Sequence, residues 1–116
     1  MTFPLQIAFR NMDFTESLDT KVREKAAHLD KMFGPLTRCD VVIEAPHHHH
    51  SSQHGRRYHV RIALNTPIGE IVVRGDDAHA NEDPRAAVRD AFEAAHGQLQ
   101  QLSKRRSVRE AQAAAD

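Results

Sequence analysis

Residues 3–33 read FPLQIAFRNMDFTESLDTKVREKAAHLDKMF, and this stretch predicts a strand, a tight turn and an amphipathic helix in direct succession. In its first part three apolar residues alternate with polar or small ones: Leu5, Ile7 and Phe9. That alternation has the period of a half-buried β-strand. The next residues, NMD, break the pattern, and Thr15 then stands where a helix N-cap is expected. The stretch therefore predicts a sheet with at least one helix packed against it.

The helix predicted from this stretch has one apolar stripe and a cationic flank. The stripe consists of residues at helical spacing: Leu18, Val22, Leu29 and Phe33. Lys21, Lys25 and His28 follow at i, i+4 and i+7, so they line one side of the stripe. A helix that packs its stripe on a sheet and keeps cations at the edge is well placed to contact phosphate. The alternative is an ordinary solvated surface, because acids such as Glu24 are interspersed.

Three further strands and a second helix are expected downstream. The strands are predicted within residues 41–43, 58–64 and 70–74, from a β-branched run and from alternation. Asp83 and Pro84 then form a helix start signal, an N-cap residue followed by a first-turn proline. The apolar face of this second helix consists of Val88, Ala91, Phe92, Ala95, Leu99 and Leu102. The order β-α-β-β-β-α predicts an α+β fold, with two helices on one face of a mostly antiparallel four-stranded sheet.

The second helix also has a cationic flank. Arg85, Arg89 and His96 lie on one side of its apolar face, and a basic run follows: Lys104, Arg105 and Arg106. If the flanks of both helices border the same groove, they form a cationic channel for an RNA backbone. His59 and Arg61 are expected on the face of the third strand that points away from the core. They could add RNA contacts there, although solvated polar residues are common at such positions.

The composition favours one domain and excludes several classes of function. The chain has 116 residues, with a domain expected at 1–106 and a basic, Ala-rich tail at 107–116 that extends the helix or is disordered. Its 16 basic and 16 acidic residues balance, so RNA binding must rest on where the charges lie. A single cysteine, Cys39, permits no internal disulfide. Neither a signal peptide nor a bilayer-spanning stretch is evident, which predicts a cytoplasmic protein. Without a nucleophile or phosphate-loop motif, we expect neither an enzyme nor a cofactor.

A histidine-rich run lies between the second and third predicted strands. Its members are His47, His48, His49, His50 and His54. Neutral imidazoles can bind Zn²⁺ or Ni²⁺, but selective sites take their ligands from a fixed geometry, which adjacent loop residues lack. A polar loop with weak metal affinity is therefore the favoured interpretation, and no metal site is predicted.

The ordered set of elements resembles one known family, the ribosome hibernation promoting factors. They are also called ribosome-associated inhibitors and sigma-factor modulation proteins. The matching stretches are PLQIAFRNM, TESL, VREKAAHLDKMF and EDPRAAVRDAFEAAHGQL, and the resemblance covers residues 4–106. It implies a fold like that of double-stranded-RNA-binding domains. It also implies a short-form factor, without catalysis, that binds the small (30S) ribosomal subunit and its 16S rRNA. The site would be the mRNA channel near the A and P sites, where the protein blocks tRNA and mRNA during stress or stationary phase.

The resemblance carries over to individual residues unevenly. Lys25 matches a family lysine in the middle of the first helix, and residues 104–106 fall near the family's basic helix end. Family members commonly carry more cations in the second half of the second helix, where this chain has Ala94, Gly97 and Gln101. The expected RNA-binding residues are Lys21, Lys25, His28, Arg61, Arg85, Arg89, Lys104, Arg105 and Arg106. Two rival functions stay open, a metal-binding protein built on the histidine run and a general RNA-binding module; no membrane or small-molecule partner is expected.

Overall fold

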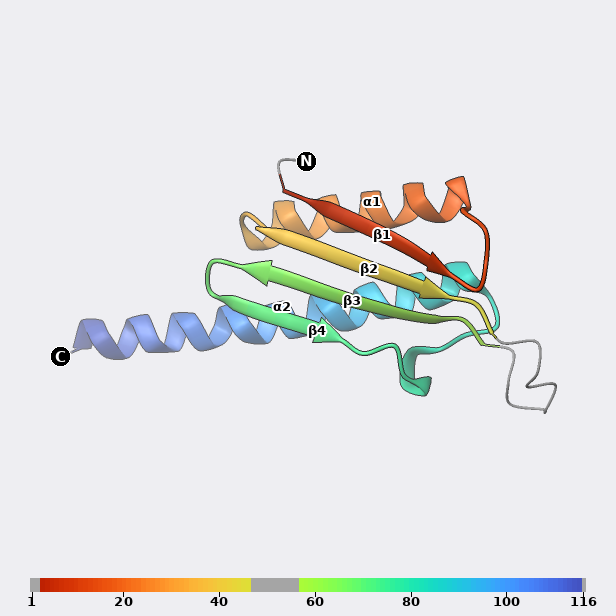
Figure 1. Cartoon of the computed structure of the whole chain (residues 1–116). Helices are drawn as coiled ribbons and strands as arrows, with labels where there is room; N and C mark the ends of the chain where they lie inside the picture. Colours follow the sequence, from red (N-terminus) through yellow and green to blue (C-terminus); the bar gives the residue numbers. More distant parts are fainter. Residues whose placement is uncertain (1–2, 47–56, 116) are drawn as a thin grey trace.

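The elements of the chain follow the predicted order, with one short addition. The computed structural model describes residues 3–46 and 57–115. The elements are β1 (Leu5–Arg10), α1 (Glu16–Phe33), β2 (Arg38–Glu44), β3 (His59–Thr66), β4 (Gly69–Val73), the 3₁₀ helix η1 (Asp77–His79) and α2 (Pro84–Ala115) (Figure 1). The second strand begins three residues before the predicted stretch, and η1 lies between β4 and α2, where no element was predicted. The predicted α+β class is confirmed.

The four strands form one mixed sheet in the order β1-β2-β3-β4. β1 pairs with β2 in parallel, because α1 carries the chain back across the sheet between them, and the other two pairings are antiparallel. Val41 lies opposite Ile7 on one side and Ile62 on the other, and Ile62 lies opposite Val73. One apolar row therefore crosses all four strands on a single face, as the alternation in the sequence requires.

Both helices cover that apolar face and run alongside each other in the same direction (Figure 1). Val22 and Ala26 of α1 and Val88 and Ala91 of α2 are fully buried, so small and β-branched residues hold the helices close to the sheet. Cys39 is also buried in this core, and burial raises the pKa of its thiol to about 12, with a smaller contribution from Asp40. A thiol of that pKa is protonated at neutral pH, so Cys39 fills space and is not a nucleophile.

Of the two predicted N-cap residues, Asp83 makes the expected cap hydrogen bond and Thr15 does not. Asp83 caps α2 as expected, because its Oδ1 accepts a hydrogen bond from the backbone N–H of Arg85 at 2.9 Å. Thr15 stands at the N-cap of α1, but its side chain makes no cap hydrogen bond and donates to the Asp13 carbonyl at 3.4 Å. Gly34 ends α1 with a φ of 80°, a conformation that glycine adopts without strain.

The second helix continues well past the sheet (Figure 1). Leu102 packs over the β3–β4 turn, where a Cβ added at Gly69 would lie 3.4 Å from its methyl groups. Beyond Leu102 the helix runs on to Ala115 without a break. The domain boundary at residue 106 stays a prediction, because the helix shows no interruption there.

Candidate nucleic-acid interface

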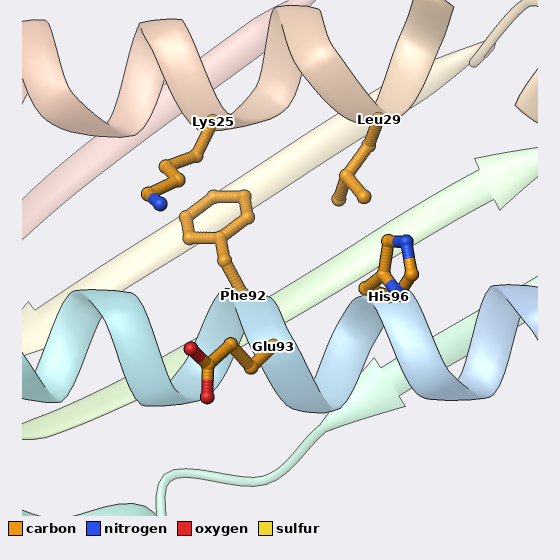
Figure 2. A pocket seen from close by; sticks show the side chains of 5 residues that line it. All are labelled: Lys25, Leu29, Phe92, Glu93 and His96. Atoms are coloured by element: carbon orange, nitrogen blue, oxygen red, sulfur yellow. The ribbon is translucent and has the colours of Figure 1, made fainter. Parts of the chain in front are cut away.

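A depression of about 280 Å³ lies between the two helices. Its lining residues come from facing turns of the two helices: Lys25, Leu29, Phe92, Glu93 and His96 (Figure 2). Leu29 and Phe92 form an apolar base and are each only 3% exposed, and the Phe92 ring extends from α2 toward α1. The three polar side chains surround this base. We call this feature the inter-helix groove.

Of the polar side chains of the groove, His96 is packed against an aromatic ring, and Lys25 and Glu93 are in no ion pair in the described chain. His96 packs edge-on against Phe33, with 5.2 Å between the ring centroids and 71° between the planes. Lys25 and Glu93 face the same groove from opposite helices, yet neither takes part in any ion pair within 4.0 Å among residues 3–46 and 57–105. Both charges are therefore available to a bound molecule.

Other cations predicted from the sequence lie on the same flanks. Lys21 is one turn before Lys25 on α1, and on α2 Arg89 is one turn and Arg85 two turns before Phe92. Arg85 is exposed and, like Lys21, belongs to none of the ion pairs found in the described chain. Arg89 differs, because its Nε donates to Asp90 at 3.1 Å and its charge is partly compensated. The two flanks border one groove, which is the arrangement that a cationic channel requires.

The remaining candidates do not reach this groove. His28 is exposed on α1 and does not line the groove. Lys104 and Arg105 are exposed on α2 beyond Leu102, and nothing is described of the Arg106 side chain. Arg61 is exposed on the sheet face that the helices leave uncovered, opposite the groove. Arg61 and the groove therefore lie on opposite faces of the domain, and RNA binding by the nine predicted residues stays a prediction.

His59 has a structural partner that the sequence did not indicate. Its Nε2 lies 3.0 Å from Oδ1 of Asp77, and this hydrogen bond lowers the pKa of the Asp77 carboxyl below its usual value. Tyr58 and Asn81 form an isolated antiparallel bridge beside it. These contacts fasten the segment around η1 to the start of β3, so His59 is engaged within the fold.

The metal-binding rival gains no support from the part of the chain that is described. His47 to His50 and His54 lie outside the described residues, and within them no group of three metal-binding side chains comes together. In the same part of the chain no helix is long and apolar enough to cross a membrane.

Sequence reasoning missed Glu93 as a groove residue and treated it as one of several interspersed acids. Its spacing could have indicated this place, because Glu93 comes three residues before His96 and therefore lies on the same flank of the helix. The meeting of Leu29 and Phe92 at the base of the groove could not be found in this way, since it depends on how the two helices pack.

Comparison with known proteins gives a family and a fold. A family model described as "Sigma 54 modulation protein / S30EA ribosomal protein" matches residues 5–107. No curated protein matches the chain. Among solved structures, the Thermus thermophilus Protein Y N-terminal domain is 21% identical with a TM-score of 0.64, over 84% of this chain and 94% of that one. A ribosomal subunit interface protein from Coxiella burnetii is 13% identical with a TM-score of 0.65, over 90% of this chain and 99% of that one. At these identities the two structures show a shared fold.

Proposed function

The chain belongs to the sigma 54 modulation protein / S30EA ribosomal protein family, and we propose that it inhibits translation by binding the small ribosomal subunit in the mRNA channel near the A and P sites. Family membership supports a ribosome-associated hibernation factor, and a protein of the same fold is described as a ribosomal subunit interface protein. The proposed partners are the 30S subunit and its 16S rRNA, which places the protein in the cytoplasm during stress or stationary phase. The His-run metal protein is not proposed, because no observation favours it.

The observation that carries this proposal is the convergence of uncompensated cations from both helices on one groove. Lys21 and Lys25 on α1 and Arg85 on α2 lie along the flanks that border it, without an ion pair in the described chain. The net charge of the whole chain is zero, so only such local concentration can attract RNA. Phosphate contacts of this kind fix the position of a protein on RNA without requiring a particular base sequence.

In this proposal the protein inhibits translation simply by occupying the mRNA channel. A protein held by phosphate contacts in the mRNA channel occupies the space that mRNA and tRNA need, and it does so without forming or breaking bonds. The rigid sheet keeps the two helices at a fixed separation, so the groove is preformed and little conformational entropy is lost on binding. Release of the protein then depends on competition from mRNA and tRNA for the channel and on the ionic strength.

We expect the protein to sediment with purified 30S subunits in a salt-dependent manner. The three uncompensated cations on the flanks of the groove, Lys21, Lys25 and Arg85, correspond to about three displaced counterions. At a slope of roughly −0.7 per phosphate, raising monovalent salt from about 50 to 200 mM should weaken binding roughly 20-fold. The measurement is pelleting through sucrose at constant magnesium, with 50S subunits as the control. Absence of the protein from the 30S pellet at low salt would rule the proposal out, and so would equal recovery with both subunits.

A further inference from the structure

The inter-helix groove has a composition that phosphate binding alone does not explain. It combines an apolar base, Leu29 and Phe92, with a cation, a carboxylate and an imidazole. We propose that the depression receives one unpaired nucleotide of the bound RNA and that Glu93 recognises its base. Proteins recognise single-stranded RNA by packing splayed bases on aromatic side chains and hydrogen-bonding their edges. This inference rests on the proposed function and names a ligand for part of the same surface.

The size of the depression suits a single base. Its volume of about 280 Å³ is just below the range of about 300–1,000 Å³ in which drug-sized ligands are buried. The depression lies open between the helices, so a nucleotide can enter while its backbone continues along the cationic flanks. A base placed there would lie over Leu29 and Phe92, which form the buried floor of the depression and are each 3% exposed.

The two opposite charges of the groove suit two different parts of a nucleotide, the phosphate and the base. Lys25 and Glu93 lie at the same end of the depression on facing helices, and neither is in an ion pair in the described part of the chain. The ammonium group of Lys25 can donate to a phosphate oxygen. The carboxylate of Glu93 accepts hydrogen bonds only, so its ligand must be a donor.

The donor that suits Glu93 is an exocyclic amino group. Cytosine presents one at N4, adenine at N6 and guanine at N2, and carboxylates accept from the cytosine amino group in known complexes. Uracil has the same ring size as cytosine but carries O4 in place of the amino group. Oxygen at that position would leave the carboxylate facing an acceptor. The groove should therefore prefer cytidine to uridine, two nucleotides of nearly equal shape.

Removing the carboxylate distinguishes this proposal from binding of the RNA backbone alone. If the groove binds only phosphates, Glu93 is a repulsive charge, and its loss must strengthen RNA binding. If Glu93 accepts from a base, its loss must weaken binding of RNA that carries that base. The two accounts predict effects of opposite sign from one substitution.

The test compares Glu93→Ala with Glu24→Ala, a matched variant. Glu24 is an exposed acid on α1 next to Lys25 in sequence, and it does not line the depression. Alanine is well tolerated at exposed helix positions, so both variants should fold. The probes are labelled ten-nucleotide oligomers of cytidine, of uridine and of abasic ribose-phosphate, and binding is followed by fluorescence anisotropy at low salt.

The wild-type protein should bind the cytidine oligomer about fivefold or more tightly than the uridine oligomer. In Glu93→Ala this preference should disappear through loss of cytidine affinity, while the abasic oligomer binds at least as tightly as before. Glu24→Ala should bind all three oligomers slightly more tightly. The inference is overturned if Glu93→Ala strengthens binding of all three, or if the wild-type protein does not distinguish cytidine from uridine. The oligomer test and the sedimentation test are independent. If the wild-type protein sediments with 30S subunits but shows no preference for cytidine, only the base-recognition inference fails. If it does not sediment with 30S subunits, the proposed function fails.

Discussion

Replacing Lys25 and Arg85 together with glutamate should lower the affinity for 30S subunits on the order of a hundredfold or more. Lys25 lines the groove and Arg85 lies two turns before Phe92 on the same flank of α2, and neither is in an ion pair in the described chain. Each reversal removes an attraction and adds a repulsion of about 1 kcal/mol in water. Arg85 is a better target than Arg89, because Asp90 already compensates Arg89. The measurement is sedimentation with purified subunits, with circular dichroism to verify the fold.

The matched control reverses two arginines on the uncovered sheet face. Arg10 and Arg61 are exposed there, and neither takes part in an ion pair in the described chain. The double variant Arg10→Glu, Arg61→Glu changes the net charge by the same amount and should reduce binding much less. The opposite result, with binding lost in the sheet variant and retained in the groove variant, would place the interface on the sheet face.

Replacing Ile62 with alanine should lower the free energy of unfolding by about 2–5 kcal/mol. Ile62 is 0% exposed and lies between Val41 and Val73 in the apolar row beneath the helices, so its truncation leaves a cavity. For a domain of this size the loss should lower the melting temperature by roughly 8–20 °C. The measurement is thermal or urea-induced unfolding.

Arg61, the neighbouring residue, provides the control for this substitution. It points to the uncovered face, and Arg61→Ala should change stability by less than about 0.5 kcal/mol. Equal effects at the two positions would contradict the register of β3, because consecutive strand residues must face opposite sides of the sheet.

The sequence was sufficient to predict the fold because its local signals agree with one another. The alternation around Ile7 and Ile62 gave the inward faces of β1 and β3, and Asp83-Pro84 marked the start of α2. The early start of β2 was missed because residues 38–40 are mixed in polarity. In the structure Arg38 and Asp40 pair at 2.8 Å on the uncovered face, while Cys39 is buried between them.

The site was less accessible to prediction, because it depends on relations between elements. Helical periodicity placed Lys25 and Arg85 on flanks, but only the packing of α1 beside α2 shows that these flanks border one groove. Arg61 was grouped with them by charge, although the sheet separates it from the helices. The pairing of Arg89 with Asp90 and the place of Glu93 depend on side-chain conformation, which periodicity does not determine.

The central claim is that the inter-helix groove faces rRNA in the mRNA channel of the small subunit. A cryo-electron microscopy structure of the protein bound to 30S subunits tests it most directly. The account predicts density for the domain in the mRNA channel, with α1 and α2 against 16S rRNA and with Lys25 and Arg85 beside phosphates. Density outside the channel, or a domain whose uncovered sheet face contacts the RNA while the helices face solvent, would contradict it.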